Sequence, residues 1–185
     1  MKRFALVTGA SSGIGLQICH SLARRGYNII LTSRSENKLK TISEEINSKH
    51  GVETTYFSCD LAEKQGPQNI YNFCESKNFQ VDVLVNNAGY ALPDAFEKNS
   101  VEDEENCIRV LGTSVISLTK LFVRDMIKNN HGKIMIVSSV AAFAPPAAIQ
   151  VMYGPLKTFM NRFSEALNIN YNSKGITSTA LCPGY

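Results

Sequence analysis

Apolar residues follow two kinds of pattern along the chain. Short continuous apolar runs, such as residues 4–7, are typical of strands buried on both faces of a parallel sheet. Longer segments, such as residues 16–23, carry apolar residues at helical spacing. Read as alternating elements, the chain is predicted to form strands near residues 3–8, 27–33, 52–58, 81–86, 133–138 and 176–182. The longer segments predict helices near residues 13–25, 35–49, 63–77, 100–130 and 152–172.

The alternation of strands with helices predicts the fold class. Such a chain folds as successive β-α-β units, which assemble into a doubly wound parallel sheet of the α/β class. We expect six strands in a single domain over residues 1–185, because 44% hydrophobic residues supply one sizeable core. Ligands of such sheets bind at the carboxyl ends of the strands, so candidate chemistry is expected there.

Three glycines follow the first predicted strand directly. Gly9, Gly13 and Gly15 lie between an apolar run and a helical pattern. A phosphate needs backbone N–H donors that no Cβ obstructs, and it gains from the positive end of a helix. The spacing is G-x3-G-x-G rather than the commonest G-x-G-x-x-G. On the glycines alone, a tight turn without a ligand stays open as an alternative.

A tyrosine and a lysine four residues apart provide candidate acid/base chemistry. Tyr153 and Lys157 lie on one face of a predicted helix. A free phenol titrates near pH ~10, and a nearby ammonium favours the phenolate and lowers that pKa. Ser138 and Ser139 end the preceding strand and offer a hydroxyl that can polarise a carbonyl. Because Tyr-x-x-x-Lys also occurs by chance on solvated helices, the pair needs its context to be informative.

That context is a set of further segments in a fixed order. The chain carries Asp60, then Asn-Asn-Ala-Gly at residues 86–89, then the strand 132–139 that leads to the serines, and finally Pro183-Gly184. With these segments and the two motifs, the chain resembles the short-chain dehydrogenase/reductase family from residue 2 to residue 185. Its overall sequence most resembles the branch that includes ketoacyl and ketosteroid reductases.

The resemblance implies a Rossmann-like fold and a role for each matching residue. Ser139, Tyr153 and Lys157 are the implied catalytic residues. The family pattern favours Ser139 over Ser138, although its usual spacing to the tyrosine is about one residue shorter. The implied cofactor-binding residues are Gly9, Ser11, Ser12, Gly13, Ile14, Gly15, Ser33, Arg34, Asp60, Leu61, Asn87, Ala88, Gly89, Tyr153, Lys157, Pro183 and Gly184.

The expected cofactor is NADP(H). An NAD enzyme places an acidic residue after the second strand to bind the ribose hydroxyls, whereas this chain has Ser33-Arg34 there. Ser33 leaves room for a 2′-phosphate, and the planar guanidinium of Arg34 can hold it. Ser12 lacks the additional basic group that many NADP-binding relatives carry in the glycine loop.

The sequence departs from the family in two places. Family members usually carry an Asn that bends the long helix and holds a water contacting the lysine; the matching position here is Leu111 or, in another alignment, Arg109. A change in the proton relay is therefore expected, with no residue assigned to this fourth role. Family members also continue beyond Pro183-Gly184 through a substrate loop and a last strand. Two alternatives stay open: the chain is a fragment that lacks these parts, or the sequence is an incomplete record of a longer protein. As a fragment, it is expected to be less active than a full-length relative and prone to self-association.

Composition narrows the function classes. The net charge is +3, and the 19 basic and 16 acidic residues are interspersed. This pattern does not indicate a nucleic-acid-binding surface, which needs clustered basic residues. Five cysteines with no paired spacing favour a reducing, cytoplasmic setting, and no metal-ligand spacing is present. No apolar run reaches the length expected of a membrane span.

These observations predict an oxidoreductase that transfers a hydride between NADP(H) and a carbonyl or secondary alcohol. Its expected partners are a small-molecule substrate and further copies of the chain, as a homodimer or homotetramer. A non-catalytic nucleotide-binding sensor or scaffold on the same fold is the alternative from another class. An isomerase or dehydratase is the alternative among enzymes.

Overall fold

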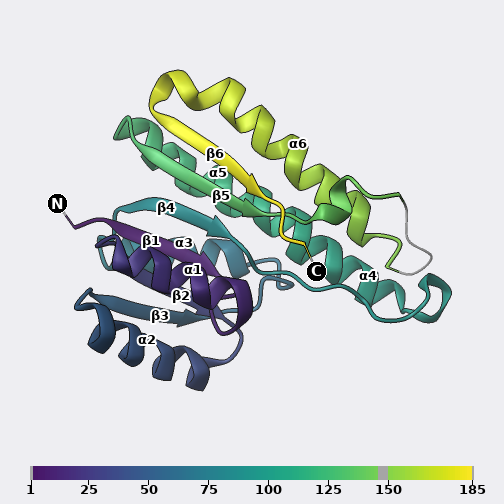
Figure 1. The fold of residues 1–185 in the computed structure, drawn as a ribbon, viewed down its shortest axis with the longest axis horizontal. Coiled ribbons are helices and arrows are strands. Elements are labelled where there is room, and N and C mark those ends of the chain that lie inside the picture. Colours follow the sequence, from purple (N-terminus) through teal and green to yellow (C-terminus); the bar gives the residue numbers. More distant parts are fainter. Residues whose placement is uncertain (1, 146–149, 185) are drawn as a thin grey trace.

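The computed structural model describes residues 2–145 and 150–184, in which helices cover both faces of a central sheet (Figure 1). Six strands run parallel in the order β3-β2-β1-β4-β5-β6, which confirms the predicted doubly wound sheet. Each predicted strand is found within two residues of its expected bounds. The strands are β1 (Phe4–Thr8), β2 (Asn28–Ser33), β3 (Thr54–Ser58), β4 (Val81–Asn86), β5 (Gly132–Val137) and β6 (Ile176–Leu181).

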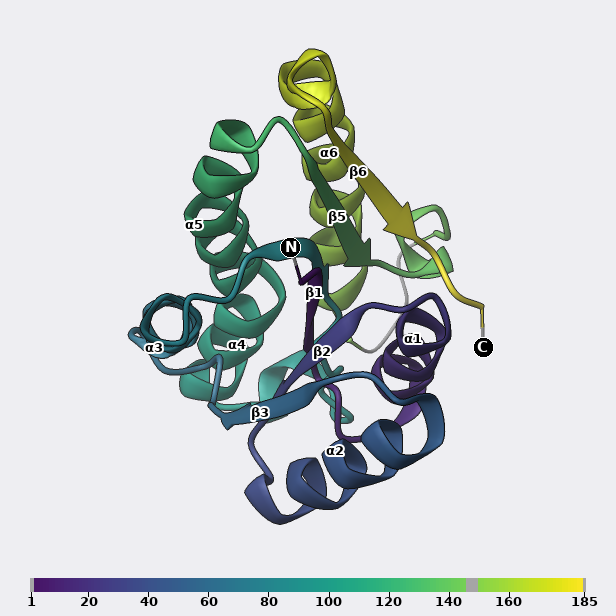
Figure 2. The ribbon, with the colours of Figure 1, turned by 90° about the vertical axis from the view of Figure 1, so that its left-hand side faces the viewer.

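The helices divide between the two faces of the sheet (Figure 2). Side chains of α1 and α2 form one apolar cluster with β1 and β2, and side chains of α3, α4, α5 and α6 form the other. All five residues of β1 are buried, as expected for a strand covered on both sides. The helices are α1 (Gly13–Arg24), α2 (Glu36–His50), α3 (Gly66–Ser76), α4 (Val101–Ile108), α5 (Ser114–Lys128) and α6 (Tyr153–Tyr171).

Helix α3 begins three residues later than the predicted start at residue 63. Asp60 holds a turn there, because the backbone N–H of Ala62 donates to its carboxylate at 2.9 Å. Gly66 then packs against the backbone carbonyl of Asp60, where a Cβ would collide, and Pro67 opens the helix in its preferred first turn. The later start leaves Asp60 and Leu61 in a loop at the carboxyl end of β3.

The long helix predicted over residues 100–130 is interrupted. A capping box of Ser100 and Asp103 starts α4, and a π-helical segment, Arg109–Thr113, separates it from α5. In that segment the N–H of Ser114 donates to the carbonyl of Arg109, five residues back. Such π segments are rare and occur frequently at functional sites. Gly112 faces α6 here, since a Cβ on it would lie 3.7 Å from Leu156 Cδ2.

The continuous helical stretch Val101–Lys128 also meets the length and composition of a membrane span, which the sequence interpretation had not recognised. Its most apolar window has a mean hydropathy of 1.3, and 56% of that window is buried inside the fold. The core helix of a globular protein passes the same test, so the absence of a membrane span stays a prediction.

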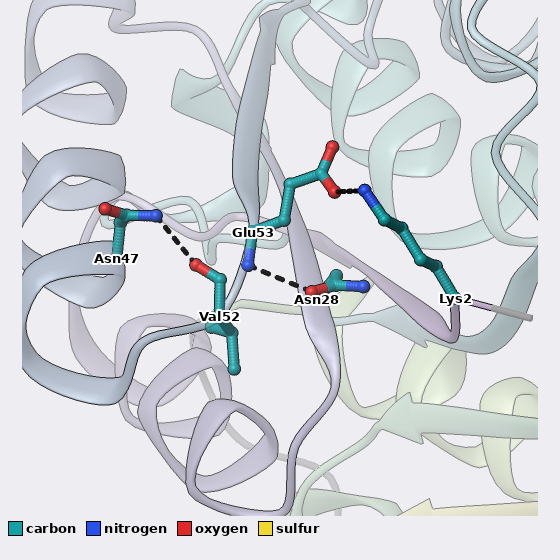
Figure 3. A network of polar contacts seen from close by, with 5 residues as sticks. All are labelled: Lys2, Asn28, Asn47, Val52 and Glu53. Atoms are coloured by element: carbon teal, nitrogen blue, oxygen red, sulfur yellow. Dashed lines mark hydrogen bonds and ion pairs between the residues drawn. The ribbon is translucent and has the colours of Figure 1, made fainter.

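Polar contacts connect the amino-terminal ends of β1, β2 and β3, at the opposite end of the strands from the residues discussed below (Figure 3). The N–H of Glu53 donates to Asn28 Oδ1 at 2.9 Å, and the Glu53 carboxylate pairs with Lys2 Nζ at 2.6 Å. Asn47 at the end of α2 donates to the carbonyl of Val52 at 2.8 Å. These contacts join β1, β2, α2 and β3, so the register of the outer strands is fixed independently of any ligand.

Candidate active site

The glycine loop is held in place by residues at the end of β4. Asn87 Nδ2 donates to the carbonyls of Thr8 and Gly9, at 2.8 and 3.2 Å. The backbone N–H groups of Asn87 and Ala88 both donate to Thr8 Oγ1 at 2.9 Å, and that hydroxyl donates to the carbonyl of Val85. The loop after β1 is therefore shaped by the neighbouring strand rather than by a ligand.

A side chain is unfavourable at each glycine of the motif, for a different physical reason. A Cβ on Gly9 would lie 2.7 Å from Asn87 Nδ2, and one on Gly15 would collide with the carbonyl of Gly9. Gly13 has φ +55° and open space around it. Only Gly adopts that conformation without strain, and the open space leaves the start of α1 accessible. The glycine loop at the positive end of α1 is therefore suited to bind a phosphate.

One cavity of about 990 Å³ runs from the glycine loop to Tyr153 across the carboxyl ends of the strands. Every residue that the sequence predicted for cofactor binding lines it: Gly9, Ser11, Ser12, Gly13, Ile14, Gly15, Ser33, Arg34, Asp60, Leu61, Asn87, Ala88, Gly89, Tyr153, Lys157, Pro183 and Gly184. The three predicted catalytic residues line it as well. Thr32 Oγ1 and Ser33 Oγ, which also border this cavity, are buried and have no hydrogen-bond partner within residues 2–145 and 150–184. The unpartnered hydroxyls of Thr32 and Ser33 and the open space at Gly13 fit a bound dinucleotide.

The two serines after β5 have different surroundings. Ser138 is 3% exposed, and its hydroxyl donates to the backbone carbonyl of Lys157 at 2.9 Å. Ser139 begins a single helical turn, Val140–Ala142, and its Oγ accepts the N–H of Ala141 at 3.1 Å. Ser139 thus keeps its own proton to donate, whereas the Ser138 proton is already used in fastening α6 to β5.

Lys157 is almost completely buried beside the candidate acid/base. Its Nζ lies 5.3 Å from the ring centroid of Tyr153 and donates to the carbonyl of Val137 at 2.8 Å. Burial lowers the pKa of Lys157 from 10.5 to about 8, and the nearby thiols of Cys107 and Cys182 act weakly in the opposite direction. At neutral pH the side chain is still largely an ammonium, which favours a phenolate nearby.

The side chains at the two candidate positions of the missing helix Asn have other surroundings. The guanidinium of Arg109 pairs with Glu105 at 2.8 Å and with Asn106 Oδ1 at 2.9 Å, along the surface of α4. Leu111 is fully buried in the core and packs against Gly89. The π segment Arg109–Thr113 interrupts the regular helix at these two positions, where the resemblance implied a bend.

Several cavity residues were missed in the sequence. Lys38 lies in the first turn of α2, and Tyr90, Asp103 and Asn106 reach the cavity from the loop after β4 and from α4. Lys38 could have been noticed, because it follows Arg34 by four residues close to the end of β2. The positions on α4 carry no such signal, because their access depends on how that helix crosses the sheet.

The sequence matches the family model for short chain dehydrogenases over residues 3–185. The chain belongs to this family. It is 36% identical over 191 residues to the very-long-chain 3-oxoacyl-CoA reductase-B of Danio rerio, covering 100% of this chain and 60% of that protein. It is 35% identical over 188 residues to the 17-beta-hydroxysteroid dehydrogenase type 3 of Rattus norvegicus, covering 99% of this chain and 60% of that protein.

Solved structures give the same result for the fold. A short-chain dehydrogenase from Sphingobium yanoikuyae in complex with NADPH superposes with a TM-score of 0.92 at 27% identity, covering 100% of this chain and 71% of that one. The chain thus spans about 60% of the length of the curated relatives named above. The predicted family and Rossmann-like fold are confirmed.

Proposed function

We propose that the protein transfers a hydride between NADP(H) and a ketone or the corresponding secondary alcohol. The observation that carries the proposal is the single cavity that joins the glycine bed to Ser139, Tyr153 and Lys157. The cavity is lined by Gly13 at one end and by Tyr153 at the other, so a dinucleotide would be held by its pyrophosphate at the glycine loop with its reactive ring toward the tyrosine. The dinucleotide, when bound, supplies or takes up the hydride, and the protein supplies position and electrostatics.

The roles of the three side chains follow from their surroundings. In the direction of reduction, Tyr153 gives its phenolic proton to the carbonyl oxygen, and Ser139 donates a hydrogen bond to the same oxygen. Lys157 then lies beside the phenolate and stabilises its charge. In the direction of oxidation, the same phenolate takes the proton of the alcohol.

The names of the relatives suggest the substrate class. A 3-oxoacyl-CoA reductase and a 17-beta-hydroxysteroid dehydrogenase both act on a ketone attached to a large apolar body. Phe143 and Val151 lie between Ser139 and Tyr153 in the chain, are 73% and 45% exposed, and offer apolar surface for such a substrate. We propose a 3-oxoacyl thioester or a 17-ketosteroid as substrate.

Turnover with purified protein tests the proposal. NADPH consumption is followed with a 3-oxoacyl thioester and with a 17-ketosteroid, for wild type, Tyr153→Phe and Tyr171→Phe. Tyr171 ends the same helix and is the matched control. Loss of about 10²- to 10⁴-fold in Tyr153→Phe alone supports the role of the phenol in proton transfer. NADPH binding by wild type with no turnover of any ketone would favour the sensor or scaffold instead.

A further inference from the structure

The single helical turn that follows Ser139 is attached to the end of β6. Two backbone N–H groups that flank the serine donate to this part of the chain. Ser138 donates to the carbonyl of Leu181 at 2.7 Å, and Val140 donates to the carbonyl of Pro183 at 3.0 Å. These bonds fix the serine backbone relative to β6. Its position relative to the catalytic tyrosine also depends on α6, because that helix begins at the tyrosine.

A second set of contacts joins the same turn to α6. Gly154 and Thr158 directly follow Tyr153 and Lys157 in the helix, so they form a stripe beside that of the two catalytic residues. A Cβ on Gly154 would lie 3.5 Å from the carbonyl oxygen of Ala141. The turn therefore packs directly against the first turn of the helix.

Thr158 supplies the hydrogen bond between the turn and the helix. Its Oγ1 lies 3.1 Å from the carbonyl oxygen of Ala142 and 3.0 Å from that of Gly154, so its one proton is shared between the two. The N–H of Ala142 donates to the carbonyl of Ser139 at 3.1 Å, and the N–H of Ala141 donates to Ser139 Oγ at 3.1 Å. A chain of hydrogen bonds thus leads from Thr158 through Ala142 to the serine.

We infer that Thr158 is a positioning residue for Ser139: its hydroxyl holds the turn against α6, so that the serine hydroxyl and the phenol of Tyr153 reach the same carbonyl oxygen. The inference rests on the proposed function, because it takes both groups to act on one ketone. Thr158 is exposed and is not among the described residues that line the cavity, so no direct contact with the nucleotide is expected. Misplacement of a catalytic group by about 1 Å can cost about 10²-fold in rate, so a contact that limits such movement affects turnover.

A double-mutant cycle separates positioning from a general structural role. Single-turnover rates of NADPH oxidation at saturating nucleotide are measured for wild type, Thr158→Val, Ser139→Ala and the double variant. The substrate is the 3-oxoacyl thioester or the 17-ketosteroid, whichever the wild type reduces faster. Thr158→Ser keeps the hydroxyl and is the conservative variant. Thr41→Val is the matched control, because Thr41 is an exposed threonine of α2 whose hydroxyl also donates to the carbonyl four residues back, that of Asn37, at 3.2 Å.

We expect Thr158→Val to lower the single-turnover rate by about five- to tenfold. The Kd of NADPH and the urea midpoint should change no more than they do in Thr41→Val, because the side chain is exposed and lies outside the nucleotide site. Thr158→Ser should retain about half of the wild-type rate or more, since it keeps the donor. In the Ser139→Ala background the serine hydroxyl is already lost, so Thr158→Val should change the rate by less than about twofold.

Two results would overturn the inference while leaving the proposed function intact. If Thr158→Val lowers the rate by the same factor with and without Ser139, it acts on the helix as a whole and not through the serine. If Thr158→Val is as fast as Thr41→Val, the bond to Ala142 does not position the turn. A wild-type protein that binds NADPH but reduces neither ketone overturns the proposed function, and the role of Thr158 with it.

Discussion

Replacing Lys157 by Met should stabilise the ligand-free protein while it removes activity. Lys157 is 4% exposed, and its ammonium makes one hydrogen bond within residues 2–145 and 150–184, to the carbonyl of Val137. Met has a similar length, is unbranched and carries no charge. The substitution therefore relieves the burial of a charge without opening a large cavity.

The magnitude follows from the pKa. Burial lowers the pKa of Lys157 from 10.5 to about 8, and each tenfold change in proton affinity is worth about 1.4 kcal/mol. Keeping the lysine charged in the fold at pH 7 thus costs about 3 kcal/mol. Loss of the hydrogen bond to Val137 offsets about 1 to 2 kcal/mol. The Met variant should be more stable by about 1 to 2 kcal/mol at pH 7.

The stability difference between wild type and Lys157→Met should change with pH. Below about pH 8 the lysine is charged in both the folded and the unfolded chain, and the fold bears the full cost. Between about pH 8 and pH 10.5 the folded chain releases the proton first, so the unfolded chain binds more protons and wild-type stability rises with pH. The advantage of the Met variant should therefore fall by about 2 to 3 kcal/mol between pH 7 and pH 10, so that it disappears or reverses.

Urea unfolding without nucleotide at pH 7 and pH 10 measures both effects. Lys120→Met is the control, because it removes an exposed lysine of α5 instead of a buried one. An advantage of Lys157→Met that is the same at both pH values would refute the reasoning. So would a variant that is clearly less stable than wild type at pH 7. Confirmation would show that this site retains a destabilising charge for the sake of its chemistry.

Other substitutions test the site by different readouts. Gly15→Ala should abolish nucleotide binding and lower the free energy of unfolding by about 1 to 3 kcal/mol, because its Cβ collides with the carbonyl of Gly9; calorimetric titration and urea unfolding check this. Ser139→Ala should reduce kcat by about 10²-fold with little effect on stability, whereas Ser138→Ala should mainly lower the unfolding midpoint. Leu111→Asn should cost about 1 to 3 kcal/mol without raising kcat, because the amide enters the core where the helix is already irregular; a severalfold increase in kcat would contradict this.

The centre of the sheet could be predicted from the sequence because strands such as Phe4–Thr8 are buried on both faces and therefore consist almost entirely of apolar residues. The alternation of such short segments with helices indicates the parallel topology. The glycine loop, Tyr153 and Lys157 were found because each combines an unusual residue type with fixed spacing near a strand end.

The features that the sequence did not reveal depend on contacts distant in the chain. The residues of the π segment Arg109–Thr113 have ordinary helical spacing in the sequence, whereas in the fold the N–H of Ser114 donates to the carbonyl of Arg109 and Gly112 faces Leu156 of α6. The difference between Ser138 and Ser139 depends on the carbonyl of Lys157, 19 residues away from Ser138. Lys38 was missed because a lysine on an exposed helix turn is usually solvated, and only the cavity gives it another meaning.

The contacts that fasten the glycine loop have a consequence for binding kinetics. Asn87 and Ala88 hold the loop through Thr8 and Gly9 before any nucleotide arrives. Association then requires little ordering of the chain, and the entropy that a flexible loop would lose is already lost during folding. Nucleotides that share the same pyrophosphate should therefore associate at similar rates. Their different affinities should appear as different residence times on the protein.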